Sequence, residues 1–315
     1  MTGRTAVADP IVRRVLLTGS TGFIGTAILA ALRRRGTPDI RVLLRPRHTG
    51  PPTPDVTVVT ADLADRRTIA GCCDGVDLVI HAASYIGPDP NRCALVNEEG
   101  TANLVRTAVR AGVGRLLYVS TAAVYGAGPH RGVVEGALTP SPSSPTSTSR
   151  LAAEQSVTSA GGVVLRPHLV YGAGDRWVLP SLVALLKAPG LIEGGTALMS
   201  MIAVRDLARV ALALALERPD IPHGAMYHAN HPRPVSLREA VEALATRLGV
   251  TAPGINLSRA AAAAALPHLP ARLLDLAAND HWYDSTAIWR DAGCRPGRPP
   301  HRDLRDATDW CLPPC

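Results

Sequence analysis

Short apolar runs alternate with stretches of helical periodicity through the first half of the chain. The run at 15–17 is followed by a glycine-rich segment, and apolar residues then recur at helical spacing up to Leu32. Further apolar runs, each expected to form a strand, lie at 40–45, 56–61, 76–81 and 115–120. A helix is expected at 97–111, ended by the glycines of 112–114. Strands that alternate with helices predict an α/β fold with a doubly wound parallel sheet covered on both faces.

The pattern loosens in the second half. Residues 127–150 are rich in Pro, Ser, Gly and Thr and predict a long loop, after which a helix resumes at 151–156. Ser236, followed by Glu239 three residues later, indicates a helix start with reciprocal capping. The other expected elements are strands at 162–172 and 226–230 and helices near 179–186 and 260–265.

Three glycines spaced three apart follow the first expected strand. They lie in Thr18-Gly19-Ser20-Thr21-Gly22-Phe23-Ile24-Gly25, between that strand and the first helix. Glycines let the backbone turn sharply and let a pyrophosphate lie against the N–H groups at the helix start. This context favours a Rossmann-type dinucleotide site over a glycine turn without a ligand. We expect cofactor contacts from Gly19, Thr21, Gly22, Phe23, Ile24 and Gly25.

The end of the second strand indicates which dinucleotide fits. In such a fold this position faces the adenosine ribose, where an Asp or Glu would bond the hydroxyls of NAD. The chain has Arg45 there, with Arg47 two residues later. A guanidinium matches a 2′-phosphate in charge and geometry, whereas the alternative is a solvated arginine at a strand end. The sequence therefore favours NADPH as cofactor, NADP over NAD.

Composition excludes several other classes of function. The 315 residues are 46% hydrophobic, which indicates a globular protein with a large core. The net charge of +7 comes from dispersed arginines rather than a basic tract, so we expect no nucleic-acid partner. No apolar run reaches the ~18 residues of a membrane helix, and the N-terminus lacks a signal-peptide pattern. The six cysteines show no zinc-type spacing, so we expect reduced thiols, no metal and a cytoplasmic location.

Several motifs occur in the order of a known family. Over about two-thirds of its length the chain resembles the extended short-chain dehydrogenase/reductases of the NAD-dependent epimerase/dehydratase type. The matching segments are 18–25, 62–63, 81–83, 96–103, 119–126, 166–172 and 204–206. The resemblance implies that the three glycines hold the pyrophosphate and that Asp62 and Leu63 border the adenine. It implies further cofactor contacts from Ala82, Ala83, Ser84, Asn97, Arg150, His168 and Leu169.

The same resemblance implies a division of the chain. Residues 1–172 would form the NADP-binding Rossmann domain, to which a return segment at about 204–232 contributes. Residues 173–203 and 233–315 would form a smaller, mainly helical substrate-binding region. Family members often dimerise through two helices, so we expect a monomer or a homodimer.

The catalytic set departs from the family. The family has a Ser or Thr, for which Thr121 is the match, and then Tyr-x-x-x-Lys on a helix. Counting back from Leu151-Ala-Ala-Glu154 puts Thr146 at the tyrosine position and Arg150 at the lysine position. The only lysine, Lys187, cannot complete the motif because Val183 lies four residues before it. Threonine is far too weak an acid to replace a phenol whose pKa is lowered by a neighbouring cation.

Three interpretations of this departure are open. The first is a ketoreductase acting on an aromatic polyketide of the angucyclinone type, in antibiotic biosynthesis. Its proton would come from Thr121 or Ser120 through water, from Tyr125, or from a phenol of the substrate beside the carbonyl. The second is a non-catalytic NADP-binding sensor or scaffold, and the third is a nucleotide-sugar epimerase or dehydratase. The absent tyrosine argues against the third, because that reaction must begin with an oxidation assisted by a base.

A few other residues carry two interpretations each. His81 is expected to be structural, His168 to contact substrate or cofactor, and Asp206 to cap its helix or pair with an arginine. The large aromatics late in the chain would line a pocket for a flat substrate or belong to the core; they are Trp177, Trp282, Tyr283 and Trp289. The expected partner is thus a small-molecule aromatic ketone.

Overall fold

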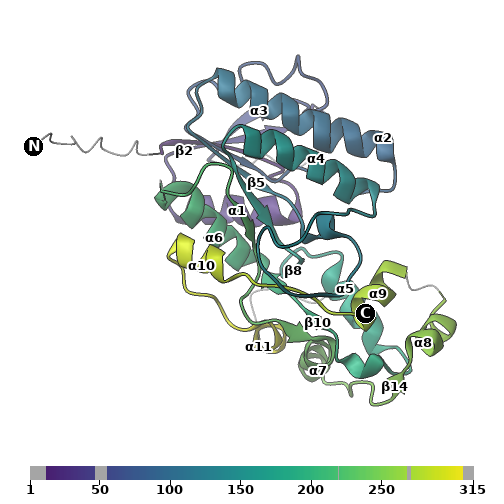
Figure 1. Ribbon diagram of the computed structural model, residues 1–315. Coiled ribbons are helices and arrows are strands. Elements are labelled where there is room, and N and C mark those ends of the chain that lie inside the picture. Colours follow the sequence, from purple (N-terminus) through teal and green to yellow (C-terminus); the bar gives the residue numbers. More distant parts are fainter. Residues whose placement is uncertain (1–11, 47–54, 219, 268–270, 308–315) are drawn as a thin grey trace, which may run out of the picture.

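The computed structural model describes residues 12–46, 55–218, 220–267 and 271–307. Its centre is a seven-stranded sheet in the order β12-β7-β5-β4-β1-β2-β3, with every neighbouring pair parallel (Figure 1). The strands are β1 (Arg14–Thr18), β2 (Asp39–Leu44), β3 (Thr57–Thr60), β4 (Leu78–His81), β5 (Arg115–Val119), β7 (Val163–Arg166) and β12 (Met226–His228). The predicted Rossmann-type doubly wound sheet is confirmed.

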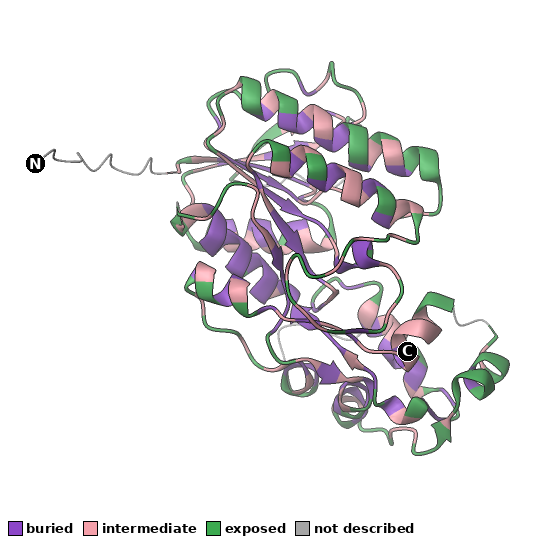
Figure 2. Cartoon of the chain, in the orientation of Figure 1, coloured by how far each residue is buried: buried purple, intermediate pink, exposed green. Residues whose placement is uncertain are grey.

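Helices cover both faces of this sheet. On one face α1 (Phe23–Arg34) packs beside α6 (Val204–Glu217), with α10 (Thr286–Ala292) against α6 (Figure 1). On the other face lie α3 (Gly100–Arg110) and α4 (Pro145–Ser159). Helix α3 continues directly from α2 (Pro90–Cys93) and the π-helix Ala94–Glu99. Figure 2 shows burial concentrated in the sheet and on the helix faces turned towards it.

Strand burial follows the apolar runs of the sequence. Val15, Leu16 and Leu17 of β1 have no exposed surface, because this central strand is covered on both faces. The edge strand β3 is mostly exposed and carries threonine at both ends. It pairs only with β2. Strand β1 lies inside the sheet, between β4 and β2, so the glycine turn that follows it lies at the middle of the sheet edge.

A second region lies beside the carboxyl ends of the strands. It contains a four-stranded sheet, β13-β10-β15-β6, and the two-stranded sheets β8-β11 and β9-β14. The strands are β6 (His130–Val133), β8 (Leu169–Tyr171), β9 (Leu191–Ile192), β10 (Leu198–Met199), β11 (Met201–Ala203), β13 (Val235–Ser236), β14 (Asn256–Leu257) and β15 (His281–Tyr283). The helices are α5 (Val178–Leu186), α7 (Leu237–Leu248), α8 (Arg259–Ala265), α9 (Ala271–Ala278) and α11 (Pro300–Asp306). Short 3-10 turns occupy Ala122–Tyr125 and Glu193–Gly195.

Three boundaries differ from the sequence prediction. The expected loop at 127–150 contains β6 and the first turn of α4, which begins at Pro145 behind a Ser144 cap. The expected strand at 162–172 is two strands in different sheets, β7 and β8, because strand pairing stops at Pro167 and the chain bends at His168. Helical structure before α3 begins at Pro90, where Asp89 caps the chain, and not at 97. The Ser236–Glu239 capping box is confirmed.

Among the described residues, none of the helices combines the length and apolar character that crossing a bilayer requires.

Candidate cofactor cleft and catalytic edge

The glycine turn has almost no room for side chains. Gly19 has φ +74°, and a Cβ there would lie 2.6 Å from the backbone of Ala82 and Ala83. A Cβ on Gly25 would lie 2.0 Å from the Gly19 carbonyl oxygen. Gly22 precedes α1 as its N-cap and offers no side chain to the first-turn N–H groups. Those N–H groups and the positive end of α1 therefore remain available to an anion, as a dinucleotide pyrophosphate requires.

Small residues after β4 continue the cleft. Ala82, Ala83 and Ser84 are partly exposed at the carboxyl end of β4, beside the glycine turn. The Thr18 hydroxyl oxygen accepts a hydrogen bond from the Ala83 N–H at 3.3 Å, which joins the ends of β1 and β4. The residues present thus fit a dinucleotide lying across these two strand ends.

His81 is buried behind this edge and connects β1 to α3 through two hydrogen bonds. Its Nδ1 and Nε2 lie 2.6 Å and 2.8 Å from the hydroxyls of Thr18 and Thr101. Burial and, to a smaller extent, the positive charge of the Arg150 guanidinium lower the pKa of His81 to about 3. The ring is therefore neutral at pH 7 and both its nitrogens are occupied, which is the structural role expected for it.

The other predicted cofactor residues occupy the same edge. The Asp62 carboxylate accepts from the Ala64 N–H at 3.0 Å, and Leu63 is buried against Gly100. Asn97 is buried in the π-helix, where its amide oxygen accepts from the Tyr85 N–H at 2.7 Å. Its amide nitrogen donates to Ser149 of α4 at 3.0 Å. Asn97 therefore holds the loop after β4 against α4.

Arg45 directly follows β2 and is exposed. This places an exposed guanidinium at the strand end that the sequence assigned to the adenosine ribose. Arg47 lies outside the described residues.

Thr146 and Arg150 occupy successive turns of α4. The Thr146 hydroxyl donates to the Gly87 carbonyl at 3.2 Å and lies 3.7 Å from the Cys93 sulfur. Arg150 Nη2 donates to the Val119 carbonyl at the end of β5 at 2.7 Å. Its Nε is buried without a hydrogen-bond partner among the described residues, as is the Tyr118 hydroxyl. The two groups are neighbours: burial raises the pKa of Tyr118, and the Arg150 guanidinium opposes this rise.

Ser120 and Tyr125 belong to one buried polar network. Ser120 donates its hydroxyl proton to Glu154, and Glu154 pairs with Arg166 through both carboxylate oxygens. Arg166 Nη1 donates to the Tyr125 hydroxyl at 2.8 Å. That hydroxyl lies 2.6 Å from Nε2 of His228.

The network fixes the direction of these hydrogen bonds. Nδ1 of His228 lies 3.1 Å from the Asp284 carbonyl oxygen and must carry the ring proton. Burial lowers the pKa of His228 to about 4, so the ring is neutral and Nε2 accepts from Tyr125. Burial also raises the pKa of Tyr125, against the opposing effect of Arg166. The protons of Ser120 and Tyr125 are therefore held inside the protein.

Thr121 differs from these two hydroxyl residues. Thr121 is partly exposed and its backbone is extended. Backbone hydrogen bonds hold the residues on either side of it: the Ser120 N–H donates to the Leu165 carbonyl, and the Ala122 N–H donates to the Pro167 carbonyl. Its oxygen accepts from the Ala123 N–H at 3.1 Å. Within the described ranges the Thr121 proton is donated to no other group, which leaves it available at the edge. The catalytic roles of Thr121, Ser120 and Tyr125 remain predictions.

His168 and Leu169 follow β7, both half-buried. The His168 N–H donates to the Asn230 side chain at 2.8 Å, and its ring stacks on His281 at 5.8 Å between centroids. Burial, then the neighbouring His281 and His130 rings, lower the pKa of His168 to about 3. Its Nε2 is buried and has no partner in the part of the chain that the structure describes.

The late aromatic residues are not grouped around one pocket. Trp289 is buried with its Nε1 donating to the Asn230 carbonyl at 2.7 Å, and Tyr283 is buried beside Tyr125. Trp282 packs over Gly132, whereas Trp177 is 57% exposed. Asp206 pairs with Arg209 at 2.9 Å, as one interpretation of the sequence expected.

Several residues of the site were missed from the sequence. Glu154, Arg166, His228 and Asn230 are buried polar residues that join β5, β7, β12 and α4. A charged residue inside the apolar run 163–166 was the one local signal, because a buried arginine requires a partner. The partner itself lies 12 positions away and could not be chosen from spacing.

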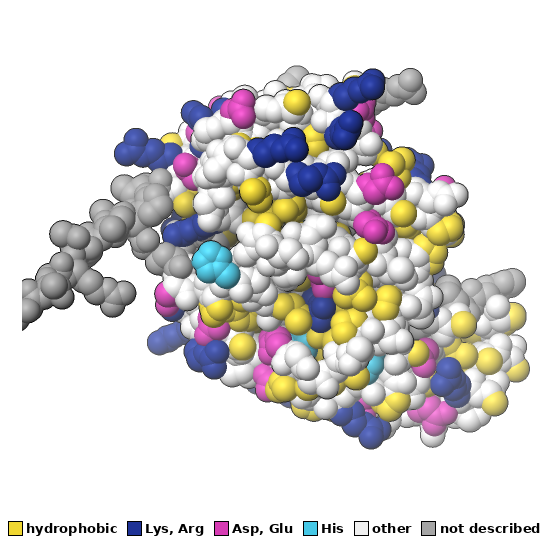
Figure 3. Space-filling model, turned by 45° about the horizontal axis from the view of Figure 1, so that its top comes forward, with side chains coloured by type: hydrophobic (Ala, Val, Ile, Leu, Met, Phe, Trp, Pro, Cys, Tyr) yellow, Lys and Arg dark blue, Asp and Glu magenta, His cyan; other side chains and the backbone are white. Residues whose placement is uncertain are grey.

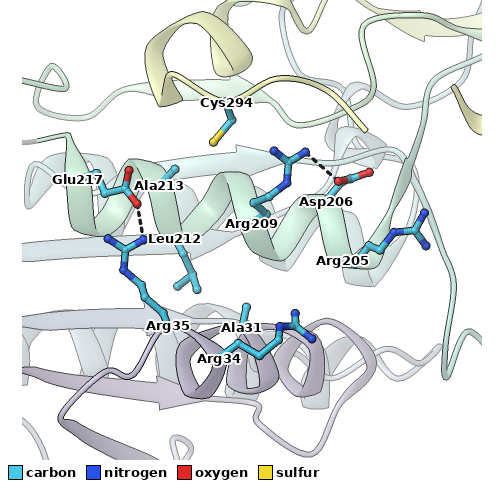
Figure 4. Close-up of a pocket in the computed structure, with 10 residues that line it drawn as sticks. All are labelled: Ala31, Arg34, Arg35, Arg205, Asp206, Arg209, Leu212, Ala213, Glu217 and Cys294. Atoms are coloured by element: carbon cyan, nitrogen blue, oxygen red, sulfur yellow. Dashed lines mark hydrogen bonds and ion pairs between the residues drawn. The ribbon is translucent and has the colours of Figure 1, made fainter. Parts of the chain in front are cut away.

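A cavity of about 350 Å³ lies elsewhere, between the outer sides of α1 and α6 (Figure 4). Arg34 at the end of α1 and Arg35 directly after it reach the cavity from one side, and Arg205 and Arg209 reach it from α6. Arg35 pairs with Glu217 across it, and Arg209 with Asp206. Since it is formed by the last turn of α1 and not the first, it is separate from the glycine turn.

Comparison with known proteins places this geometry in a family. The family model described as "NAD dependent epimerase/dehydratase family" matches residues 15–229. The chain belongs to this family, the extended branch of the short-chain dehydrogenase/reductases, and it is an NAD(P)-dependent oxidoreductase.

Two curated relatives are named as reductases. One is a 4-hydroxy-2-methyl-3-oxo-4-farnesyl-3,4-dihydroquinoline-1-oxide ketoreductase of Stigmatella aurantiaca, 29% identical over 265 residues, covering 80% of this chain and 78% of the relative. The other is a 2-alkyl-3-oxoalkanoate reductase of Stenotrophomonas maltophilia, 26% identical over 314 residues, covering 90% of this chain and 94% of the relative.

Solved structures show the same fold. Bordetella bronchiseptica WbmH, in complex with NAD⁺, superposes with a TM-score of 0.75 at 24% identity, covering 95% of this chain and 98% of WbmH. Pseudomonas aeruginosa RMD, complexed with NADPH, superposes with a TM-score of 0.70 at 23% identity, covering 93% of this chain and 96% of RMD.

Proposed function

We propose that the protein is an NADPH-dependent ketoreductase that reduces a carbonyl of an aromatic polyketide of the angucyclinone type. The proposal rests on a contrast at the carboxyl edge of the sheet, between a cofactor site that fits the family and a catalytic position that does not. The glycine turn fits a dinucleotide, whereas the family's tyrosine position holds Thr146, whose hydroxyl is bonded to the Gly87 carbonyl. Two relatives named as reductases of ketones support the reaction class.

The cofactor would supply a hydride to the carbonyl carbon. Gly19, Gly22 and Gly25 would hold its pyrophosphate against the start of α1, and Arg45 would face the 2′-phosphate. Arg150, anchored on Val119, would add positive charge behind the ribose.

The remaining requirement is a proton for the alkoxide that forms. Ser120 and Tyr125 hold their protons within the network, and neutral His228 cannot act as an acid near pH 7. A phenol of the substrate, peri or ortho to the carbonyl, can donate internally as charge develops. The Thr121 hydroxyl would then orient the carbonyl oxygen by a hydrogen bond. We therefore propose substrate-assisted proton transfer with Thr121 as the orienting donor.

The test uses paired substrates. Oxidation of NADPH is followed with a polycyclic aryl ketone carrying a peri-hydroxyl and with its O-methyl ether. The ether should react about 100-fold more slowly or worse, because it lacks the internal acid. Equal rates would disprove substrate assistance. Tight NADPH binding without turnover on any ketone would instead favour the NADP-binding sensor.

A further inference from the structure

We infer that Trp177 is a specificity-determining residue, the flat apolar surface on which the ring system of the substrate stacks. This inference rests on the proposed function and extends it to the substrate class. The starting observation is solvent exposure: Trp177 is 57% exposed in a chain whose other two described tryptophans are packed against protein. An exposed indole leaves a large hydrophobic area in water unless a ligand covers it.

The loop that carries Trp177 is rigidly held. The Asp175 carboxylate is buried and accepts three backbone N–H groups, from Trp177 at 2.7 Å, Val178 at 3.0 Å and Leu179 at 2.8 Å. The Trp177 carbonyl accepts the Ser181 hydroxyl at 2.6 Å. Because these bonds fix the backbone at the start of α5, little conformational entropy would be lost when a ligand covers the indole.

The same loop lies against the cofactor end of the molecule. Gly174, three residues before Trp177, is placed so that a Cβ on it would be 3.6 Å from Phe23 Cδ2. Phe23 is the first residue of α1, directly after the glycine turn. The loop that carries Trp177 therefore lies beside the start of α1, close to the expected pyrophosphate position.

A second exposed apolar residue lies at the edge of the sheet where the strands end. Ile86 is 58% exposed in the segment after β4, and the parallel strands β4 and β7 end at one edge. Thr121, after β5, lies between them in strand order. Figure 3 shows hydrophobic side chains gathered near the middle of the visible face, between the upper and lower halves of the molecule. Trp177 follows β8, the short strand that comes directly after β7 in the chain. Exposed apolar side chains such as those of Ile86 and Trp177 suit a flat ketone better than a sugar, whose hydroxyls need polar partners.

The kinetic test compares Trp177→Ala with Trp177→Phe. The probes are a hydroxyanthraquinone whose hydroxyl is peri to the carbonyl, and decalone, which has no aromatic face. Trp177→Ala should raise KM for the hydroxyanthraquinone about tenfold and leave KM for decalone and NADPH within about twofold, while Trp177→Phe retains most of the affinity. Val109→Ala, equally exposed on the outer side of α3, is the matched control and should change nothing.

An unchanged KM for the aromatic ketone in Trp177→Ala would overturn the inference, as would a rise in KM for NADPH alone. Fluorescence keeps the question separate from turnover. With NADP⁺ present, the hydroxyanthraquinone should quench tryptophan emission more in the unmodified protein than in Trp177→Phe. Equal quenching would also overturn the inference. If no ketone is reduced, the proposed function fails, yet the quenching difference still reports on stacking.

Discussion

Glu154 and Arg166 form an ion pair in which each side chain is only 5% exposed. Arg166, on β7, donates hydrogen bonds to both carboxylate oxygens of Glu154. Glu154 lies on α4 and also accepts a hydrogen bond from the hydroxyl of Ser120, which follows β5. The pair thereby joins three elements directly behind Thr121. An ion pair this deeply buried is costly to desolvate, so its value lies in holding geometry more than in net stability.

Breaking this pair should destabilise the protein strongly. Glu154→Gln should lower the free energy of unfolding by about 3–5 kcal/mol, because Arg166 keeps a buried charge without a counter-ion. Urea unfolding followed by circular dichroism measures the change. The double variant Glu154→Leu/Arg166→Met should recover much of the loss; a double variant as unstable as the single one would contradict this account.

Cofactor preference should depend on Arg45. Arg45→Ala should raise KM for NADPH about tenfold or more and leave KM for NADH nearly unchanged, because a charge-assisted contact to the 2′-phosphate is lost. Arg110→Ala, an exposed arginine at the end of α3, serves as control. Parallel changes for both cofactors would show that Arg45 does not read the phosphate.

The glycine turn should tolerate no side chain at Gly25. Gly25→Ala places a methyl group 2.0 Å from the Gly19 carbonyl oxygen, so the turn must open and the Kd for NADPH should rise beyond measurement. Gly254→Ala is the matched control, since nothing lies within 4 Å of a Cβ there and its φ is not positive. Binding is measured by calorimetry; normal binding by Gly25→Ala would refute the proposed pyrophosphate position.

Thr146 should leave room for the substrate and should not act as the acid. Thr146→Phe should reduce ketone turnover at least tenfold while NADPH still binds, because the ring fills the position near Gly87 and Cys93. Thr148→Phe on the exposed side of the same helix should be nearly silent. Conversely, loss of turnover in Thr146→Ala with normal binding would make Thr146 the proton donor.

Acid should unfold the protein through its buried histidines. The pKa values of His81 and His168 are lowered to about 3 and that of His228 to about 4, all by burial, whereas an unfolded histidine titrates near 6.5. The unfolded state therefore binds more protons below pH 6.5, and stability falls as pH drops from there towards 4, by about 1.4 kcal/mol per pH unit for each histidine. His81→Gln should reduce proton uptake on unfolding at pH 5 by about one. An unchanged slope of stability against pH would contradict the prediction.

The sheet was predictable because its signals are local. Fully buried parallel strands such as 15–17 appear as continuous apolar runs, and the glycine turn carries its own constraint at Gly19 and Gly25. Strands β6 and β15 were missed because they are short: β6 lies among glycines and prolines, and β15 is flanked by polar residues. The bond from Tyr125 to His228 joins residues 103 positions apart, and no periodicity reports such a pairing.

Arg150 has a consequence for any attempt to rebuild the family's catalytic set. Its guanidinium is anchored on the Val119 carbonyl, so it is committed to the strand end and not to the turn of α4 that holds residue 146. Thr146→Tyr alone would therefore supply a phenol without the mobile ammonium that makes such a phenol acidic. Return to the common mechanism needs two coordinated changes, neither of which improves activity by itself. A substitution at only one of these two positions would therefore leave the chemistry of the site unchanged.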